Sequence, residues 1–190
     1  MAGRPESFIA FRDLAQLLLG LTVLADHEFV QLGREAPGPD RAPRRVLGGP
    51  GGYPTRPVRL RNGRWLRVSV ALWLAETAHG PRLKVSESSY QYQDDREGER
   101  EIVRYDYLRQ PNRNEPASHI NIYGTLTVPG VLPPGQLLSR VHLPAGRVPL
   151  EAVLRMLVDD LKVPPATDEG VWRPVLAASE EMFLEIAHRV

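Results

Sequence analysis

Hydrophobic and polar residues alternate along a stretch in the middle of the chain. Every second residue between positions 66 and 74 is aliphatic: Leu66, Val68, Val70, Leu72 and Leu74. Because successive side chains of a strand point to opposite faces of a sheet, this period of two predicts a strand with one apolar face. A turn at residues 78–81 leads to a second predicted strand over residues 82–93. The charged segment 94–101 that follows predicts a hairpin tip.

Three further strand-like runs follow, over residues 102–108, 119–128 and 140–143. Each run carries polar residues at alternate positions: Arg104 and Asp106, then His119 and Asn121, then Arg140 and His142. We therefore expect an antiparallel meander of about five strands, with these six side chains on one shared face.

The two ends of the chain show helical spacing instead. Apolar residues recur every three or four positions within residues 7–26, 150–161 and 174–186, which is typical of helices with one apolar stripe. The predicted fold class is α+β, with N- and C-terminal helices packed on the apolar face of the sheet and the polar face left open. A signal peptide is the alternative for residues 17–25. Glu6 and Asp13 are unlike a positively charged leader, and the run is too short to span a bilayer.

Residues 33–63 are rich in Pro, Gly and Arg. This composition predicts a long loop or arm within a single domain that comprises residues 1–190. Two interpretations stay open: a solvated linker, or an arm that follows phosphates. The arginines that would serve the second are Arg44, Arg45, Arg56 and Arg59. Residues 48–52 (GGPGG) lack the spacing of a phosphate-binding loop.

Composition narrows the chemistry further. The 190 residues carry a formal net charge of +1, which argues against a generally basic nucleic-acid coat. There is no cysteine, so disulfides, thiolate metal sites and a cysteine nucleophile are excluded, as fits a cytoplasmic protein. We expect neither a cofactor nor a membrane span.

The polar strand residues suggest acid–base chemistry on a phosphate. His119 and His142 titrate near neutral pH and can serve as general base and general acid. Arg104 and Arg140 can hold a phosphate, and Asp106 can orient a histidine. Further contacts to nucleic acid are expected from side chains that stack or donate hydrogen bonds: Asn121, Tyr107 and Tyr123. These residues suit metal-independent cleavage of RNA.

Other interpretations of the same residues are weaker or less specific. Any exposed sheet face needs polar residues, so the pattern is also that of a solvated surface. A metal site formed by His119, His142 and Asp106 is disfavoured, because no HxxxH or HxH pair anchors it and the neighbouring arginines repel a cation. No GxSxG segment indicates a serine hydrolase.

Three runs carry a resemblance to a known family: RYDYLRQP from Arg104, SHINIYG from Ser118, and RVHLPAGRVPLEAVLRMLVDDL from Arg140. They resemble bacterial toxins of the TumE type over roughly residues 100–161, and also uncharacterised actinobacterial proteins with RYDY, HxN and FLEIAHR runs. Leu108 departs from the toxin pattern, since a histidine would follow RYDY there. The resemblance implies a toxin–antitoxin or defence context with RNA as the target.

Two functional hypotheses follow from the sequence. The first is a bacterial cytoplasmic protein that binds nucleic acid or a nucleotide on the open sheet face, with ribonuclease activity as its chemistry. The alternative is a non-catalytic interaction protein that docks a partner protein through the sheet face and the Arg-rich arm.

Overall fold

The computed structural model describes residues 7–34, 44–51, 55–77, 80, 82–111, 116–124 and 143–187. Three helices and eight strands lie within these ranges, which confirms the α+β class. The helices are α1 (Phe8–Leu21), α2 (Leu150–Asp159) and α3 (Glu169–Ala187). The strands are β1 (Gln31–Arg34), β2 (Arg44–Gly48), β3 (Val58–Arg59), β4 (Trp65–Ala75), β5 (Arg82–Gln93), β6 (Glu101–Leu108), β7 (Ser118–Ile122) and β8 (Leu143–Pro144).

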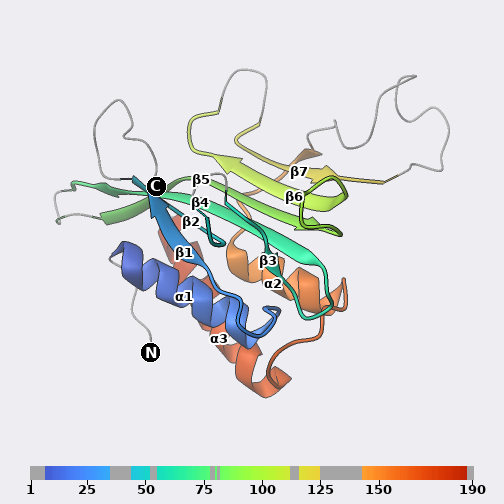
Figure 1. Cartoon of the computed structure of the whole chain (residues 1–190). Coiled ribbons are helices and arrows are strands. Elements are labelled where there is room, and N and C mark those ends of the chain that lie inside the picture. The colour runs from blue at the N-terminus through green and yellow to red at the C-terminus, as the bar shows by residue number, and fades with distance from the viewer. Residues whose placement is uncertain are drawn as a thin grey trace, which may run out of the picture.

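One antiparallel sheet contains all the described strands, in the order β1-β2-β4-β5-β6-β7-β8 (Figure 1). β3 also pairs with β4, beside the end that β2 leaves free. The predicted hairpin is present, since β4 and β5 pair from Trp65↔Gln93 to Ala75↔Arg82. The predicted meander therefore corresponds to β4–β8, and the sheet is larger than the five strands expected.

The three additional strands precede β4 in the chain, and β2, β3 and the last two residues of β1 lie in the segment predicted as a loop or arm. For residues 33–34, 44–48 and 58–59 that prediction is wrong. Leu47 and Val58 are almost completely buried, and both strands complete the hydrogen bonds of β4 along one edge. A strand of two to five residues needs little local propensity when a long neighbour supplies its partners.

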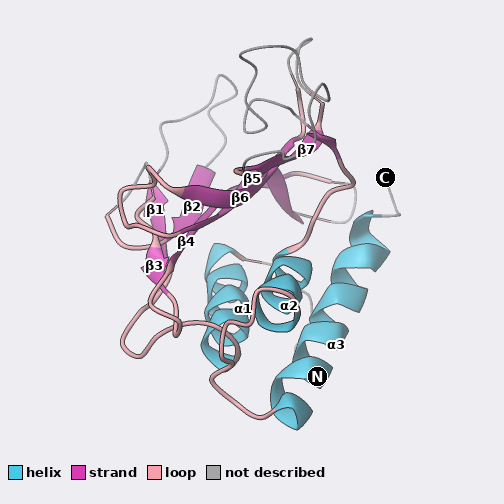
Figure 2. Cartoon of the chain, turned by 90° about the vertical axis from the view of Figure 1, so that its right-hand side faces the viewer, coloured by secondary structure: helices cyan, strands magenta, loops and turns pink. Residues whose placement is uncertain are grey.

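The helices all lie on one side of the sheet (Figure 2). The apolar face of β4 packs under them, with Leu66, Val68 and Leu72 each fully buried. Helix α1 begins at the Ser7 cap, whose hydroxyl accepts a hydrogen bond from the Ala10 N–H, and it ends at Leu21, five residues before the predicted end. None of the three described helices is long and apolar enough to cross a membrane.

Helix α3 begins five residues earlier than predicted, at Glu169. Pro174 lies inside its second turn, where its missing N–H removes a single helical hydrogen bond. The early start brings Trp172, 2% exposed, into the core beside Leu176. A tryptophan buried in the first turn is therefore part of what holds the helix against the rest of the molecule.

The last two predicted strands are shorter as described. β7 ends at Ile122, whereas the prediction extended to residue 128, and the described part of β8 comprises residues 143–144. Residues 125–142 lie outside the described part of the chain. The predicted site residues Arg140 and His142 are therefore among those whose placement the structure leaves undescribed.

Candidate functional site

Register between β6 and β7 brings four of the predicted polar residues onto one face. Arg104 lies opposite Asn121, and Asp106 lies opposite His119. The residue between them on β6, Tyr105, donates a hydrogen bond to Met156 of α2, so its side chain points to the helices. The four polar side chains therefore point away from the helices, onto what we call the outer face.

These side chains form an ion-pair network on the outer face. Arg104 donates to Asp106 through Nε at 2.8 Å, and its Nη1 lies 3.3 Å from both carboxylate oxygens of Glu101. The same Asp106 oxygen lies 3.4 Å from Nε2 of His119. Burial alone would lower the pKa of Arg104, but Asp106 and Glu101 outweigh it and raise that pKa. The guanidinium charge is thus already matched by two carboxylates.

The outer face is not open at this network. His119 is 5% exposed and Asn121 is 1% exposed. The second ring nitrogen of His119, Nδ1, lies 3.4 Å from the Pro116 carbonyl oxygen. Because each ring nitrogen faces an oxygen of the protein itself, neither faces a substrate in this arrangement. The geometry is that of a histidine which fixes the sheet and the preceding loop.

The two predicted tyrosines lie in different places. Tyr123 continues the outer face of β7, and burial followed by its hydrogen bond to Glu101 raises its pKa. Tyr107 lies opposite Ser118, on the helix side, where its ring stacks on the Arg147 guanidinium at 4.6 Å. Tyr107 therefore cannot contact a ligand bound beside Arg104.

The four arginines predicted to follow phosphates are also separated. Arg44 lies opposite Trp73 on the outer face. Arg45 pairs with Leu72, so it belongs to the face of the sheet that the helices cover. Arg56 and Arg59 are exposed. Arg59 pairs with Trp65, so both belong to the outer face at the far end of β4.

The predicted hairpin tip between β5 and β6 folds back over this end of the outer face. Asp95 accepts hydrogen bonds from the backbone N–H groups of Gly98, Glu99 and Arg100, at 2.6–3.0 Å. Gln93 is fully buried and donates to the carbonyl oxygens of Asp95 and Arg96. We call residues 94–100 the β5–β6 loop.

A glycine is required where the β5–β6 loop meets the sheet. Gly98 has a φ of +88°, and a Cβ there would lie 3.2 Å from Nε2 of Gln91 and 3.4 Å from Nη2 of Arg67. The left-handed backbone and the close approach both favour glycine. The loop therefore sits directly on the side chains of β4 and β5.

Three arginines surround a tryptophan where the loop meets β4, and we call this cluster the Trp65 patch: Arg59, Trp65, Arg67 and Arg96. The Arg96 guanidinium lies over the Trp65 ring, 5.6 Å from its centroid. Within the described part of the chain, no carboxylate forms an ion pair with any of these three arginines. The Nε–H of Arg67 is buried and meets no acceptor among the described residues. Unlike Arg104, these three guanidinium groups are therefore not neutralised by a carboxylate of the described residues.

Sequence reasoning identified only part of the Trp65 patch. Arg59 was expected to contact nucleic acid, but within a flexible arm. Alternation along β4 was sufficient to place Trp65 and Arg67 on one face. No periodic signal could bring Arg96 to them, because its position depends on the fold of the β5–β6 loop.

Comparison with known proteins gives no relative: no family model, curated protein or solved structure matches the chain. Across the residues described, no cluster of three His, Asp or Glu side chains is arranged to hold a metal ion.

Proposed function

We propose that the protein binds single-stranded nucleic acid at the Trp65 patch on the outer face of the sheet. The observation that carries this proposal is one half-buried tryptophan beside three arginines that form no ion pair with a carboxylate of the described residues. Single-strand binding proteins combine these two elements, since arginines meet the phosphates and aromatic rings stack on the bases.

The patch offers a definite mode of contact. Arg96 is exposed and covers the Trp65 ring, so this ring face is reachable from solvent once Arg96 swings aside. A base would take its place on the ring, and the displaced guanidinium would pair with the adjoining phosphate. Arg59 lies directly across from Trp65 on β3, and Arg67 lies two residues farther along β4 on the same face.

Acidic residues near the Trp65 patch limit the affinity expected for nucleic acid. The β5–β6 loop also carries Glu97 and Glu99, which are both exposed. Asp94 is neutralised by Arg64 at 3.0 Å and Arg100 at 2.9 Å. Two or three phosphate contacts are therefore the most the patch can provide, so binding should be weak and should decrease with salt by the modest slope of those few contacts.

Ribonuclease activity is not part of this proposal. It would need an acid–base pair, and the His119 imidazole faces Asp106 and the Pro116 carbonyl. Catalysis by His119, Asp106 and Arg104, with Arg140 and His142, stays a prediction that the described residues do not support.

The test is fluorescence anisotropy of a short labelled single-stranded RNA, titrated with the protein at about 50 mM salt. Trp65→Ala should weaken binding by about 1–3 kcal/mol, the loss expected for one stacked base. Arg67→Gln should weaken binding and reduce its salt dependence.

Arg82→Gln is the matched control. Arg82 is exposed and pairs with Ala75, at the opposite end of the ladder from Trp65 and about 30 Å away. The Arg82→Gln variant should bind the RNA as tightly as wild type. Binding that is indifferent to Trp65→Ala and Arg67→Gln would remove the patch from the account, and no binding at all would favour the docking of a partner protein.

A further inference from the structure

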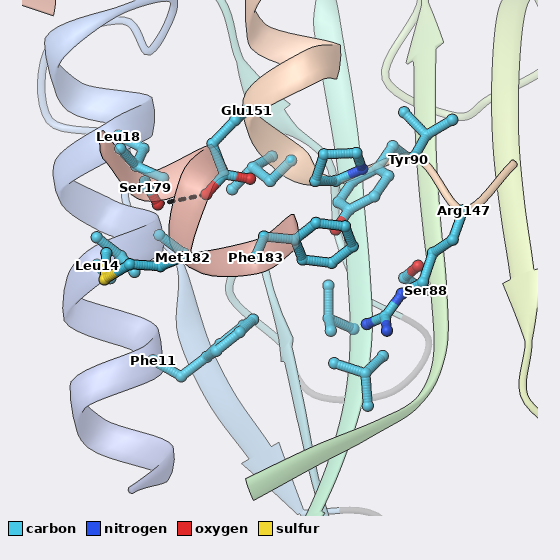
Figure 3. A pocket seen from close by; sticks show the side chains of 16 residues that line it. Phe11, Leu14, Leu18, Ser88, Tyr90, Arg147, Glu151, Ser179, Met182 and Phe183 are labelled. Carbon is cyan, nitrogen blue, oxygen red and sulfur yellow. Dashed lines mark hydrogen bonds between the residues drawn. The ribbon is translucent and has the colours of Figure 1, made fainter. Parts of the chain in front are cut away.

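A cavity of about 110 Å³ lies between the helices and the sheet, on the side away from the Trp65 patch (Figure 3). Most of its wall is apolar, and the side chains come from α1, β4, β5 and α3: Phe11, Leu14, Leu18, Val70, Val85, Met182 and Phe183. Five polar residues also reach it: Ser88, Tyr90, Arg147, Glu151 and Ser179. An apolar cavity with a few convergent polar groups is the usual form of a small-molecule site.

Arg147 is the unusual member of this wall. Its guanidinium is stacked between two rings, 4.6 Å from the centroid of Tyr107 and 4.8 Å from that of Phe183. Stacking fixes the plane of the guanidinium while leaving its N–H donors, which lie in that plane, without a partner. No hydrogen bond or ion pair to another described residue engages those donors. Burial lowers the pKa of Arg147, but the group remains a cation at neutral pH.

The other charged group of the wall does not neutralise Arg147. Glu151 accepts a hydrogen bond from Ser179 on α3, and the pair joins the two helices (Figure 3). Glu151 forms no ion pair with Arg147. Burial raises the pKa of Glu151, which favours its neutral form in this apolar wall. An anion that enters the cavity could therefore pair with Arg147, which has no ion-pair partner among the described residues.

We propose that this cavity binds a small carboxylic acid with a short aliphatic chain, whose carboxylate pairs with Arg147 and whose chain lies among Leu14, Val70 and Val85. A carboxylate matches the fork of guanidinium donors in two parallel hydrogen bonds. The volume sets the size of the chain: a cavity of about 150 Å³ holds one benzene molecule, so 110 Å³ suits about four to six carbon atoms. A nucleotide is far too large, so this site is independent of the Trp65 patch.

The test uses 3-methylbutanoate and its neutral isostere 3-methylbutanamide with the whole chain, observed through ¹³C-labelled methionine methyl groups. Met182 lines the cavity, whereas Met156 lies outside the wall and accepts a hydrogen bond from Tyr105. The carboxylate should shift the Met182 signal in a saturable way and leave Met156 in place. The amide should bind at least about tenfold more weakly, because it lacks the charge that Arg147 meets.

Two variants locate the site. Arg147→Met keeps an apolar stem between the two rings and should weaken 3-methylbutanoate binding by about tenfold or more, while Arg61→Met, in the exposed turn before β4, should not. Val85→Phe should fill the cavity and abolish binding without unfolding the chain. This variant tests the site if Arg147→Met does not fold. The proposal is overturned by an unmoved Met182 signal, by equal affinity for acid and amide, or by undiminished binding in a folded Arg147→Met or Val85→Phe protein.

Discussion

Asp95 shows how a single carboxylate positions the β5–β6 loop. Burial of this carboxyl group acts to raise its pKa, but the N–H groups of Gly98, Glu99 and Arg100 outweigh that effect, so the net pKa lies below the ordinary 3.8. A lowered folded-state pKa stabilises the protein above the unfolded value and loses that contribution as pH falls through the folded value.

Asp95→Asn should therefore destabilise the protein at neutral pH, and the difference from wild type should shrink below about pH 3.8. It should also weaken RNA binding, because the loop carries Arg96 to Trp65. Urea unfolding at several pH values measures the first effect. A difference that grows in acid would contradict the role assigned to Asp95.

The pKa of Glu151 is shifted in the opposite direction to that of Asp95. Burial raises its pKa, so the folded protein holds a proton that the unfolded chain releases, and stability falls as pH rises through the unfolded value near 4.5. Glu151→Gln should remove this dependence and make the protein more stable than wild type at pH 7.5, with no gain at pH 4. The exposed Glu76→Gln is the control for the loss of one negative charge. A Glu151→Gln protein that is less stable at pH 7.5 would contradict this.

At the scale of elements, α2 is held by a few fully buried leucines on its inner stripe. Leu154 and Leu157 are completely inaccessible to solvent. Leu157→Ala should cost about 2–5 kcal/mol of unfolding free energy, since it leaves a cavity in a closely packed core. Leu17→Ala, in α1, makes the same change at a side chain that is 47% exposed and should cost less than about 0.5 kcal/mol. Chemical denaturation of the two variants compares them, and equal losses would contradict the assignment of the core.

Periodicity predicted the elements that carry a clear hydrophobic pattern of their own. It failed for elements that form only because a neighbouring strand supplies their hydrogen bonds. Alternation along β4 identified its buried face because the helices cover that face. The same rule could not reveal β2 and β3, since short strands among Pro and Gly depend on their hydrogen bonds to neighbouring strands, here to β4 and, for β2, also to β1. It also placed Asp106 and His119 on one face but could show neither that they pair directly nor that His119 is buried there.

At the scale of the whole molecule, the sheet separates two different environments. Its inner side packs on the helices and encloses the cavity with Arg147. Its outer side carries the neutralised Arg104 network on β6 and, two strands away on β4, the Trp65 patch. The net charge of +1 is too small to attract nucleic acid by itself, so any binding must arise from this local arrangement of arginines.

The salt dependence of RNA binding tests this account most directly. For a single strand, each phosphate contact contributes a slope of about −0.7 to the plot of log association constant against log salt concentration. We expect the slope of the Arg59→Gln, Arg67→Gln double variant to be shallower than that of wild type by about 1.4, whereas Arg82→Gln should retain the wild-type slope. Equal slopes for all three proteins would contradict the assignment of nucleic-acid binding to the Trp65 patch.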